Sequence, residues 1–283
     1  MPSYAFRIVN VFAETLLGGN PLCVFEDARG LDTATMQALA LQFNLSETTF
    51  VLPSEAATAR VRIFTPSFEM PFAGHPTLGT AQVVRETAQA GDAVTLQMQA
   101  GIIPVTAQGD RWELRAGPPG VPPASRSAAP VADLAEMLGL DVSAITGEAR
   151  WIDTGSEQLI IPLRDAATVA DAAPKIEGLI AHGSNSKRQG LAYVWAPNGV
   201  GRVVARFFFN KQGAVAEDPG TGSAAANLGG WHLATNTKLP LQVAIEQGAQ
   251  TGRPCAVGLR VTAAQEIFVS GRVVELGRGT IDL

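Results

Sequence analysis

The same order of residue types occurs once in each half of this chain, and this repeat constrains the fold more than any other feature. In the first half, a strand pattern at residues 62–64 is followed by Glu69, a Gly/Pro loop and a helix pattern of small residues. In the second half, residues 206–208 are followed by Glu217, another Gly/Pro loop and another small-residue helix pattern. Such a repeat predicts two lobes of similar construction, each with a closely packed helix.

A proline-rich segment separates the two halves. Residues 117–130 contain five prolines among Gly, Ser and Ala and show no apolar periodicity. This composition is typical of a linker between domains. We therefore predict that a first lobe covers residues 1–118 and that a second lobe begins at residue 119.

Strand and helix patterns alternate, but without the regular strand–helix–strand order of a doubly wound fold. Three strand patterns between residues 94 and 116 are separated by Gly turns and predict an antiparallel meander. Asp32 is expected to cap a helix that ends at residue 43, because its carboxylate can accept a hydrogen bond from the first helical turn. Residues 165–181 are expected to form one or two helices broken at Pro174.

Composition excludes several classes of protein. Only 17% of the 283 residues are charged, which is too few for a disordered chain or a coiled coil. The net charge of −5 argues against nucleic acid as a partner, and no apolar stretch approaches the ~20 residues of a membrane span. The N-terminus lacks the features of a signal peptide, and Cys23 and Cys255 match no metal spacing. We therefore expect a cytoplasmic, reduced protein without a metal site.

Glu47 is the first candidate for proton transfer. It lies between the end of a helix pattern and the start of a strand, with Leu45 and Phe50 nearby. Desolvation by such neighbours is expected to raise the pKa of the carboxyl group towards the range that suits proton transfer. The alternative is an exposed loop glutamate without a function.

His75 and Asp218 are further candidates, each in a Gly/Pro loop before a helix pattern. His75 precedes a helix expected over residues 77–86, and its ring could donate to a substrate oxygen. Asp218 precedes a helix expected to start near Ser223 and could contact a substrate amine. The alternatives are a structural histidine and a carboxylate that only caps its helix. The two helix N-termini would suit an anion such as a substrate carboxylate.

Other sequence motifs are rejected. Residues 220–225 fit the pattern G-x-G-x-x-A of a dinucleotide-binding loop, but no strand–helix–strand unit surrounds them. A Walker loop would need a lysine that is absent, and no G-x-S-x-G nucleophile elbow occurs.

Several longer motifs occur in order along the chain. They are G-N-P at residues 19–21, N-L-S-E-T-T-F at 44–50, R-I-F-T-P at 62–66, P-F-A-G-H-P at 71–76 and E-D-P-G-T-G-S-A at 217–224. Shorter segments at residues 247–248, 252–254 and 277–281 continue the match. Together these motifs resemble the PhzF family over essentially the whole chain. The Pro-Gly pair after Asp218 follows the broad family, whereas small Ala-like residues are expected in the phenazine enzymes proper.

The resemblance implies a diaminopimelate-epimerase-like α/β (α+β) fold. Its two pseudo-symmetric lobes would each be a mainly antiparallel sheet wrapped around a central helix. The last strand, about residues 268–283, would rejoin the first lobe and leave residues 119–267 as the second. Proteins with this fold commonly form homodimers, and we expect one here.

The family's type enzyme isomerises trans-2,3-dihydro-3-hydroxyanthranilate in phenazine biosynthesis without a metal or organic cofactor. By motif, the general acid/base falls on Glu47, while His75 and Asp218 would orient the ring substituents. The groups expected to bind the small-molecule carboxylate substrate are those of Asn20, Gly74, Gly220, Thr221, Gly222 and Ser223.

The related epimerases use two cysteines as opposed bases, but neither loop before the two helices contains Cys. Racemisation by two thiols is therefore excluded. We predict a cofactor-independent isomerase in which one carboxylate takes a proton from one carbon and returns it to another on the same face. Two alternatives stay open: an amino- or hydroxy-acid epimerase or racemase with Glu47 and Asp218 as opposed bases, and a metabolite-binding protein without turnover.

Overall fold

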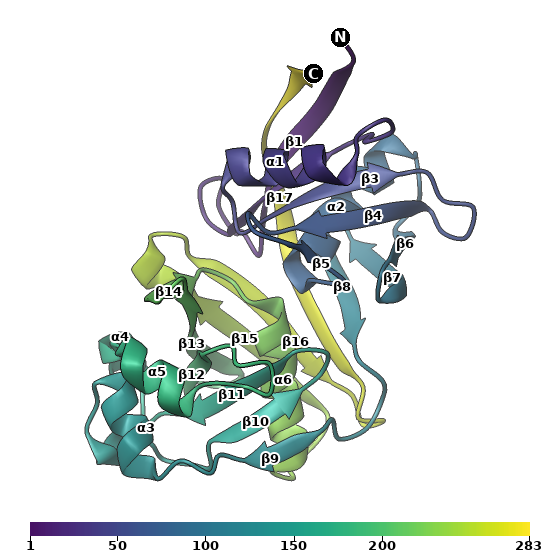
Figure 1. Ribbon diagram of the computed structural model, residues 1–283. Helices are drawn as coiled ribbons and strands as arrows, with labels where there is room; N and C mark the ends of the chain where they lie inside the picture. The colour runs from purple at the N-terminus through teal and green to yellow at the C-terminus, as the bar shows by residue number, and fades with distance from the viewer. The chain divides into compact units, whose positions relative to one another are not determined.

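The computed structural model describes all 283 residues of the chain. The chain divides into two compact units: unit 1 comprises residues 1–115 and 270–283, and unit 2 comprises residues 116–269. The last strand, β17 (Ile267–Asp282), is the antiparallel partner of the first strand, β1 (Ser3–Val11). Both ends of the chain therefore belong to unit 1, where they are drawn in yellow and purple in Figure 1.

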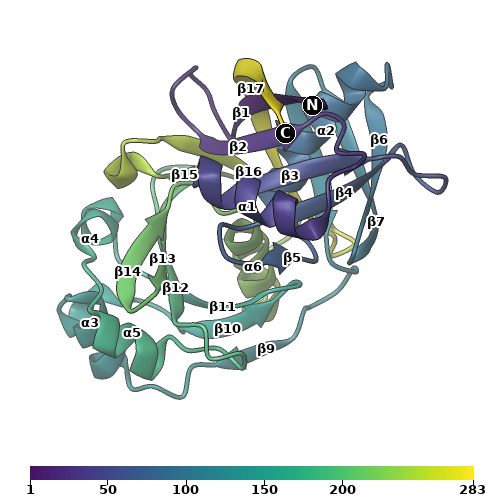
Figure 2. The same ribbon diagram turned by 45° about the horizontal axis from the view of Figure 1, so that its top comes forward.

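Unit 1 contains strands and two helices, of which α1 packs on β3 and β4 (Figure 2) and α2 packs on β1, β2, β3, β6 and β7. The remaining elements of this unit are β2 (Asn20–Phe25), α1 (Thr33–Phe43), β3 (Glu47–Leu52), β4 (Ala59–Phe64), β5 (Glu69–Met70), α2 (Gly74–Thr87), β6 (Ala93–Met98), β7 (Gly101–Gln108) and β8 (Arg111–Ala116).

Helix α2 lies unusually close to the strands because its residues are small. A Cβ atom on Gly79 would lie 2.7 Å from Cδ2 of Leu22 and 2.9 Å from Cγ2 of Val11, so a larger residue cannot be accommodated without a shift. On the same face, the buried hydroxyl groups of Thr49 and Thr80 are hydrogen-bonded at 2.8 Å. The helix is thereby fixed to both β2 and β3.

Helix α1 shows how local sequence signals set an element. The side chain of Asp32 accepts a hydrogen bond from the backbone N–H of Thr35 at 2.8 Å, and the helix ends at Asn44 in the left-handed conformation. Its buried residues join the aromatic side chains of Phe25, Phe50 and Phe64 in one core cluster. The helix and the cap predicted from Asp32 are therefore confirmed.

Unit 2 is built around strands that contact helix α6, with three shorter helices packed elsewhere. Its elements are β9 (Ala124–Arg126), α3 (Val131–Leu138), β10 (Arg150–Asp153), β11 (Glu157–Pro162), α4 (Ala166–Asp171), α5 (Ile176–His182), β12 (Leu191–Pro197), β13 (Arg202–Lys211), β14 (Ala214–Asp218), α6 (Gly222–Ala234), β15 (Leu241–Gln247), β16 (Cys255–Val261) and two single 3₁₀ turns at Val142–Ala144 and Ala249–Thr251.

The two units have the same order of strand pairings. In unit 1, β2 is parallel to β3, β3 is antiparallel to β4, and β4 pairs with β5 in antiparallel and with β6 in parallel orientation. In unit 2, β11, β12, β13, β14 and β15 repeat these relations in the same order. Residues of one unit can therefore be matched to residues of the other by register.

The matched registers place the same ion pair in both units. Phe64 lies opposite Glu69, and Phe208 lies opposite Glu217. Arg62 donates to both carboxylate oxygens of Glu69 at 2.7 and 2.6 Å, and Arg206 donates to both of Glu217 at 3.1 and 2.7 Å. The arginine and the acidic residue noticed in the sequence repeat are thus partners in each unit.

The structure corrects three details of the sequence analysis. Helix α2 begins at Gly74, not at residue 77, because a proline in the first turn, Pro76, has no N–H group that the helix needs. The proline-rich segment is not only a linker, since Ala124–Arg126 forms β9 and pairs with β10. Asp218 ends a strand, β14, and is not in a loop.

No helix is both long and apolar enough to cross a membrane.

Candidate active site

Glu47 and His75 come together in unit 1 although they belong to different elements. Glu47 is the first residue of β3, and His75 is the second residue of α2. The Nε2 atom of His75 lies 3.4 Å from Oε2 of Glu47, and the side chains are 7% and 15% exposed. The start of β3 and the first turn of α2 therefore place a carboxylate and an imidazole side by side, where little water surrounds them.

The backbone of Pro21 determines the tautomer of His75. The ring is hydrogen-bonded to the backbone of Pro21, which has no N–H and can only accept. Because Nε2 faces Glu47 and makes no hydrogen bond, the donor is Nδ1–H. In the neutral ring, Nε2 consequently presents a lone pair towards the carboxyl group of Glu47.

Burial keeps this imidazole neutral. Desolvation lowers the pKa of His75 to about 3, against the opposing effect of the hydrogen bond to Pro21. At neutral pH the ring therefore carries no charge. The pair can hold one additional proton, shared between the carboxylate oxygen and Nε2, without an ion being placed in the protein interior.

The turn that holds Pro21 needs a glycine. Gly19 has φ +84°, and a Cβ atom there would lie 2.7 Å from the carbonyl oxygen of Val11. Asn20, which the sequence analysis assigned to substrate binding, is fully buried and pairs with Val11 in the β1–β2 ladder.

In unit 2, the segment before α6 is held by Gln247. Its amide Nε2 donates to the carbonyl oxygen of Asp218 at 2.9 Å and to the hydroxyl group of Thr221 at 3.0 Å. The Thr221 hydroxyl in turn donates to Oδ2 of Asp218 at 2.5 Å. These bonds fix the orientation of the Asp218 carboxylate. Gln247 was not predicted as a site residue, because only the fold brings β15 beside this segment.

The predicted residues of unit 2 lie in one short stretch at the start of α6. Gly220 and Thr221 precede the helix, Gly222 is its first residue, and Ser223 is its second. The first backbone N–H groups of a helix have no partner within it. Here the N–H of Thr221 donates to Oε1 of Gln247 at 3.4 Å. Ser223 is matched by register to His75, and its Oγ accepts a hydrogen bond from Gln158 at 3.0 Å.

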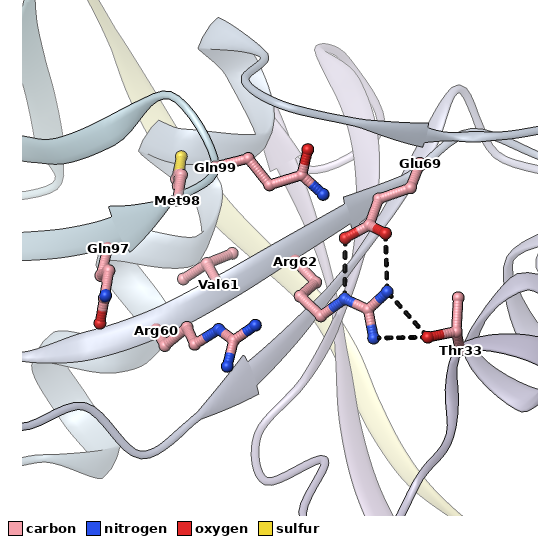
Figure 3. A pocket seen from close by; sticks show the side chains of 8 residues that line it. All are labelled: Thr33, Arg60, Val61, Arg62, Glu69, Gln97, Met98 and Gln99. Carbon is pink, nitrogen blue, oxygen red and sulfur yellow. Dashed lines mark hydrogen bonds and ion pairs between the residues drawn. The ribbon is translucent and has the colours of Figure 1, made fainter.

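A cavity of about 410 Å³ in unit 1 is lined by none of the predicted site residues (Figure 3). The guanidinium group of Arg62 lies in the lining of this cavity. It donates hydrogen bonds to the carboxylate of Glu69 and to the hydroxyl group of Thr33. The eight residues that line the cavity are Thr33, Arg60, Val61, Arg62, Glu69, Gln97, Met98 and Gln99. None of them was a predicted site residue.

Both cysteines lie outside the segments before α2 and α6. Cys23 is in β2 and Cys255 is in β16, and both are buried and outside any disulfide. Burial raises the pKa of the Cys23 thiol far above its usual range. No group of three or more His, Cys, Asp and Glu side chains is arranged to hold a metal ion.

Comparison with known proteins gives matches over nearly the whole chain. The profile of the phenazine biosynthesis-like protein family (PhzC-PhzF) matches residues 9–279. The chain is 39% identical to an uncharacterized isomerase of Pasteurella multocida over 290 residues, which cover 98% of this chain and 94% of the relative. It is 34% identical to a trans-2,3-dihydro-3-hydroxyanthranilate isomerase of Pseudomonas chlororaphis, with 98% and 99% covered.

A solved structure shares the fold. The PhzF-family phenazine biosynthesis protein of Bacillus anthracis superimposes with a TM-score of 0.87, covers 100% of both chains and is 23% identical in sequence. The mixed α/β fold predicted from the sequence is therefore confirmed.

Proposed function

This chain is an isomerase of the PhzF family of phenazine biosynthesis-like proteins, and from that premise we propose that it moves a proton between two carbon atoms of a small cyclic carboxylate that bears amino or hydroxyl groups. The substrate that we propose is trans-2,3-dihydro-3-hydroxyanthranilate, for whose isomerisation the Pseudomonas relative is named. No metal or organic cofactor takes part in the proposed reaction.

The proximity of Glu47 and His75 is the observation that carries this proposal. A carboxylate that stands 3.4 Å from the lone pair of a neutral imidazole can take a proton from carbon and keep it in a hydrogen bond. In the proposed step, a C–H bond of the substrate breaks and an O–H bond to Glu47 forms while the substrate's double bonds shift. The O–H bond then breaks as the proton is delivered to another ring carbon, so atoms and electrons balance.

For unit 2 we propose a role in binding. Asp218 would contact an amino or hydroxyl substituent, and Ser223 with the segment formed by Gly220, Thr221 and Gly222 would bind acceptor groups. In unit 1, Gly74 is proposed to contact the substrate through its backbone, and Asn20, which is fully buried, is proposed to act through the turn that holds Pro21. The orientation of Asp218 by Thr221 supports its part in this proposal.

We also propose that the two units are the pseudo-symmetric lobes of a diaminopimelate-epimerase-like fold and that the protein forms a homodimer. The proposal of two pseudo-symmetric lobes is supported by the common order of strand pairings and by the matched positions of α2 and α6. Light scattering tests whether the protein is a homodimer, and a monomer at micromolar concentration would contradict this proposal.

The test of the proposed activity is an incubation of trans-2,3-dihydro-3-hydroxyanthranilate with the protein in D₂O. We expect a shifted double-bond system in the product by NMR, with deuterium only at the carbon that receives the proton. Deuterium at one stereocentre without a double-bond shift would indicate an epimerase instead. Binding with neither change would indicate a metabolite-binding protein.

A further inference from the structure

Unit 2 contains a chain of buried amide side chains that ends at Ser223. Asn227 in α6 is fully buried and Gln158 in β11 is 3% exposed. Asn227 donates to Oε1 of Gln158 at 2.8 Å, and Gln158 donates to Oγ of Ser223 at 3.0 Å. Two primary amides are therefore placed in an interior position, where each hydrogen-bonding group needs a partner.

Backbone groups fix the orientation of Asn227. Its Oδ1 accepts from the backbone N–H of Thr154 at 2.9 Å and from the hydroxyl group of the same residue at 2.7 Å. Its Nδ2 donates to the backbone carbonyl of Ser156 at 2.8 Å. A backbone N–H can only donate and a carbonyl can only accept, so the side-chain amide cannot be reversed without the loss of both bonds.

The orientation of Asn227 determines that of Gln158 and then that of Ser223. The second proton on Nδ2 of Asn227 requires an acceptor, so Gln158 must present Oε1 to it and Nε2 to Ser223. Oγ of Ser223 accepts this bond, and its own proton must therefore point in another direction. The structure gives that proton no acceptor within the chain.

Unit 1 indicates that the fold itself does not need this chain of amides. By register, Gln158 is matched to Leu22 and Asn227 to Gly79. These two residues meet in an apolar contact, since a Cβ on Gly79 would lie 2.7 Å from Leu22. The same architecture is thus built with apolar residues in one unit and with buried amides in the other. Because burial of amides is unfavourable unless every bond is made, the amides of unit 2 point to a functional requirement.

We propose that Asn227 and Gln158 are positioning residues that hold the Ser223 hydroxyl group as an obligatory hydrogen-bond donor to the ligand. The group bound at Ser223 is then a carboxylate or carbonyl oxygen and not an ammonium, which cannot accept a hydrogen bond. This inference rests on the proposed function only in assuming that the substrate acid binds at the start of α6.

The test uses two ligands that differ only in the carboxylate. 3-Hydroxyanthranilate, an aromatic analogue of the proposed substrate, carries it, and 2-aminophenol lacks it. Ser223→Ala removes the donor. Gln158→Glu keeps an acceptor oxygen for Asn227, but it replaces Nε2, the atom that faces Ser223, by a second oxygen that attracts the Ser223 proton. By calorimetry we expect each variant to bind 3-hydroxyanthranilate about 10- to 100-fold more weakly, with 2-aminophenol unaffected.

The double variant separates reorientation from simple charge repulsion. If Gln158 acts through Ser223, adding Gln158→Glu to Ser223→Ala causes no further loss of affinity. Losses that multiply would overturn the proposal. Gln242→Glu, an exposed position on β15, is the control for added charge and should leave both affinities unchanged. If Gln158→Glu does not fold, Gln158→Met removes the orienting donor without a charge and should weaken binding of the acid alone, by less than Ser223→Ala.

A neutron structure of the unliganded protein gives a readout that needs no ligand. We expect the Ser223 deuteron to point away from Gln158 and both amide deuterons of Asn227 to be engaged. A Ser223 deuteron directed at Gln158 would overturn the proposal. If wild-type protein fails to bind 3-hydroxyanthranilate, the proposed substrate class is wrong, and the neutron map still decides the role of Gln158.

Discussion

At the scale of single residues, the proposed catalytic pair of Glu47 and His75 depends on a histidine that is kept neutral. The carbonyl of Pro21 accepts a hydrogen bond from Nδ1–H, and burial lowers the pKa of His75 to about 3. An imidazolium would instead form an ion pair with Glu47, which would stabilise the carboxylate and make it a weaker base. Neutrality of His75 therefore leaves Glu47 able to take a proton from a weakly acidic C–H group.

Glu47→Gln keeps the shape of the side chain and removes its ability to take a proton. We expect turnover in the proposed reaction to fall by about 10²–10⁴ and incorporation of solvent deuterium to stop, while affinity for 3-hydroxyanthranilate changes little. Stability should hold or rise slightly, because a neutral amide is more easily buried than a carboxylate. Glu55→Gln, an exposed position before β4, is the matched control. Near-normal turnover of a folded Glu47→Gln protein would place the base elsewhere, with Asp218 as the next candidate.

The neutral state of His75 also has a consequence for stability. Its pKa is about 3 in the folded protein and 6.5 in a solvated chain, so between these values the unfolded state binds more protons. Unfolding free energy should consequently fall as pH decreases from 6.5 to 3, with a slope of up to about 1.4 kcal/mol per pH unit from this residue. Urea denaturation at a series of pH values should show a shallower slope for His75→Gln. Equal slopes for wild type and variant would contradict a neutral, buried His75.

At the scale of elements, the position of α2 decides where the histidine stands. The helix approaches β1 and β2 closely because Gly79 leaves room for the side chains of Leu22 and Val11. In unit 2 the matched helix carries Asn227 instead, and polar bonds take the place of apolar contact. At this one matched position the two units therefore differ in chemistry, although α6 also packs closely through Gly230, where an added Cβ would lie 2.6 Å from Cγ2 of Ile152.

Gly79→Ala should destabilise the protein by about 1–3 kcal/mol, since the added methyl group would overlap Leu22 and Val11. Thermal unfolding measures this loss. Gly91→Ala is the control, because Gly91 is exposed and has nothing within 4 Å of the added methyl group. An equal unfolding temperature for Gly79→Ala and wild type would show that the contact is looser than described.

At the scale of the whole molecule, unit 1 is completed by the far end of the chain. Residues 277–282 of β17 pair with residues 3–8 of β1, and Glu275 contacts the buried Arg7. Unit 1 therefore cannot finish folding until the last strand is present, whereas the residues of unit 2 are contiguous in sequence.

A chain that lacks residues 277–283 tests this dependence. We expect amide hydrogen exchange to become faster in β1 and β2, which lose a pairing partner or a neighbour of one, while amides in β12 and β13 keep their protection. A chain that lacks only Leu283 is the control. An equal loss of protection in β12 and β13 would show that the two units unfold together.

The sequence by itself determined the features that depend on neighbouring residues or on ordered motifs. Asp32 and the residues that follow it specify α1, since a cap needs only a side chain and the first turn of the helix. The repeated arginine and acidic residue indicated two similar halves, and the motifs indicated the family. Glu47, His75 and Asp218 were identified as candidates in this way, and their catalytic roles stay predictions.

Only the tertiary structure decided the features that depend on contacts between distant segments. The strand β9 is only three residues long, and it pairs with β10, a partner that no local pattern specifies. The tautomer of His75 follows from Pro21, and the donor role of Ser223 follows from Gln158 and Asn227. A residue's type states which hydrogen bonds it can make. The fold alone states which of them it makes, because orientation is fixed by partners that lie far away in the sequence.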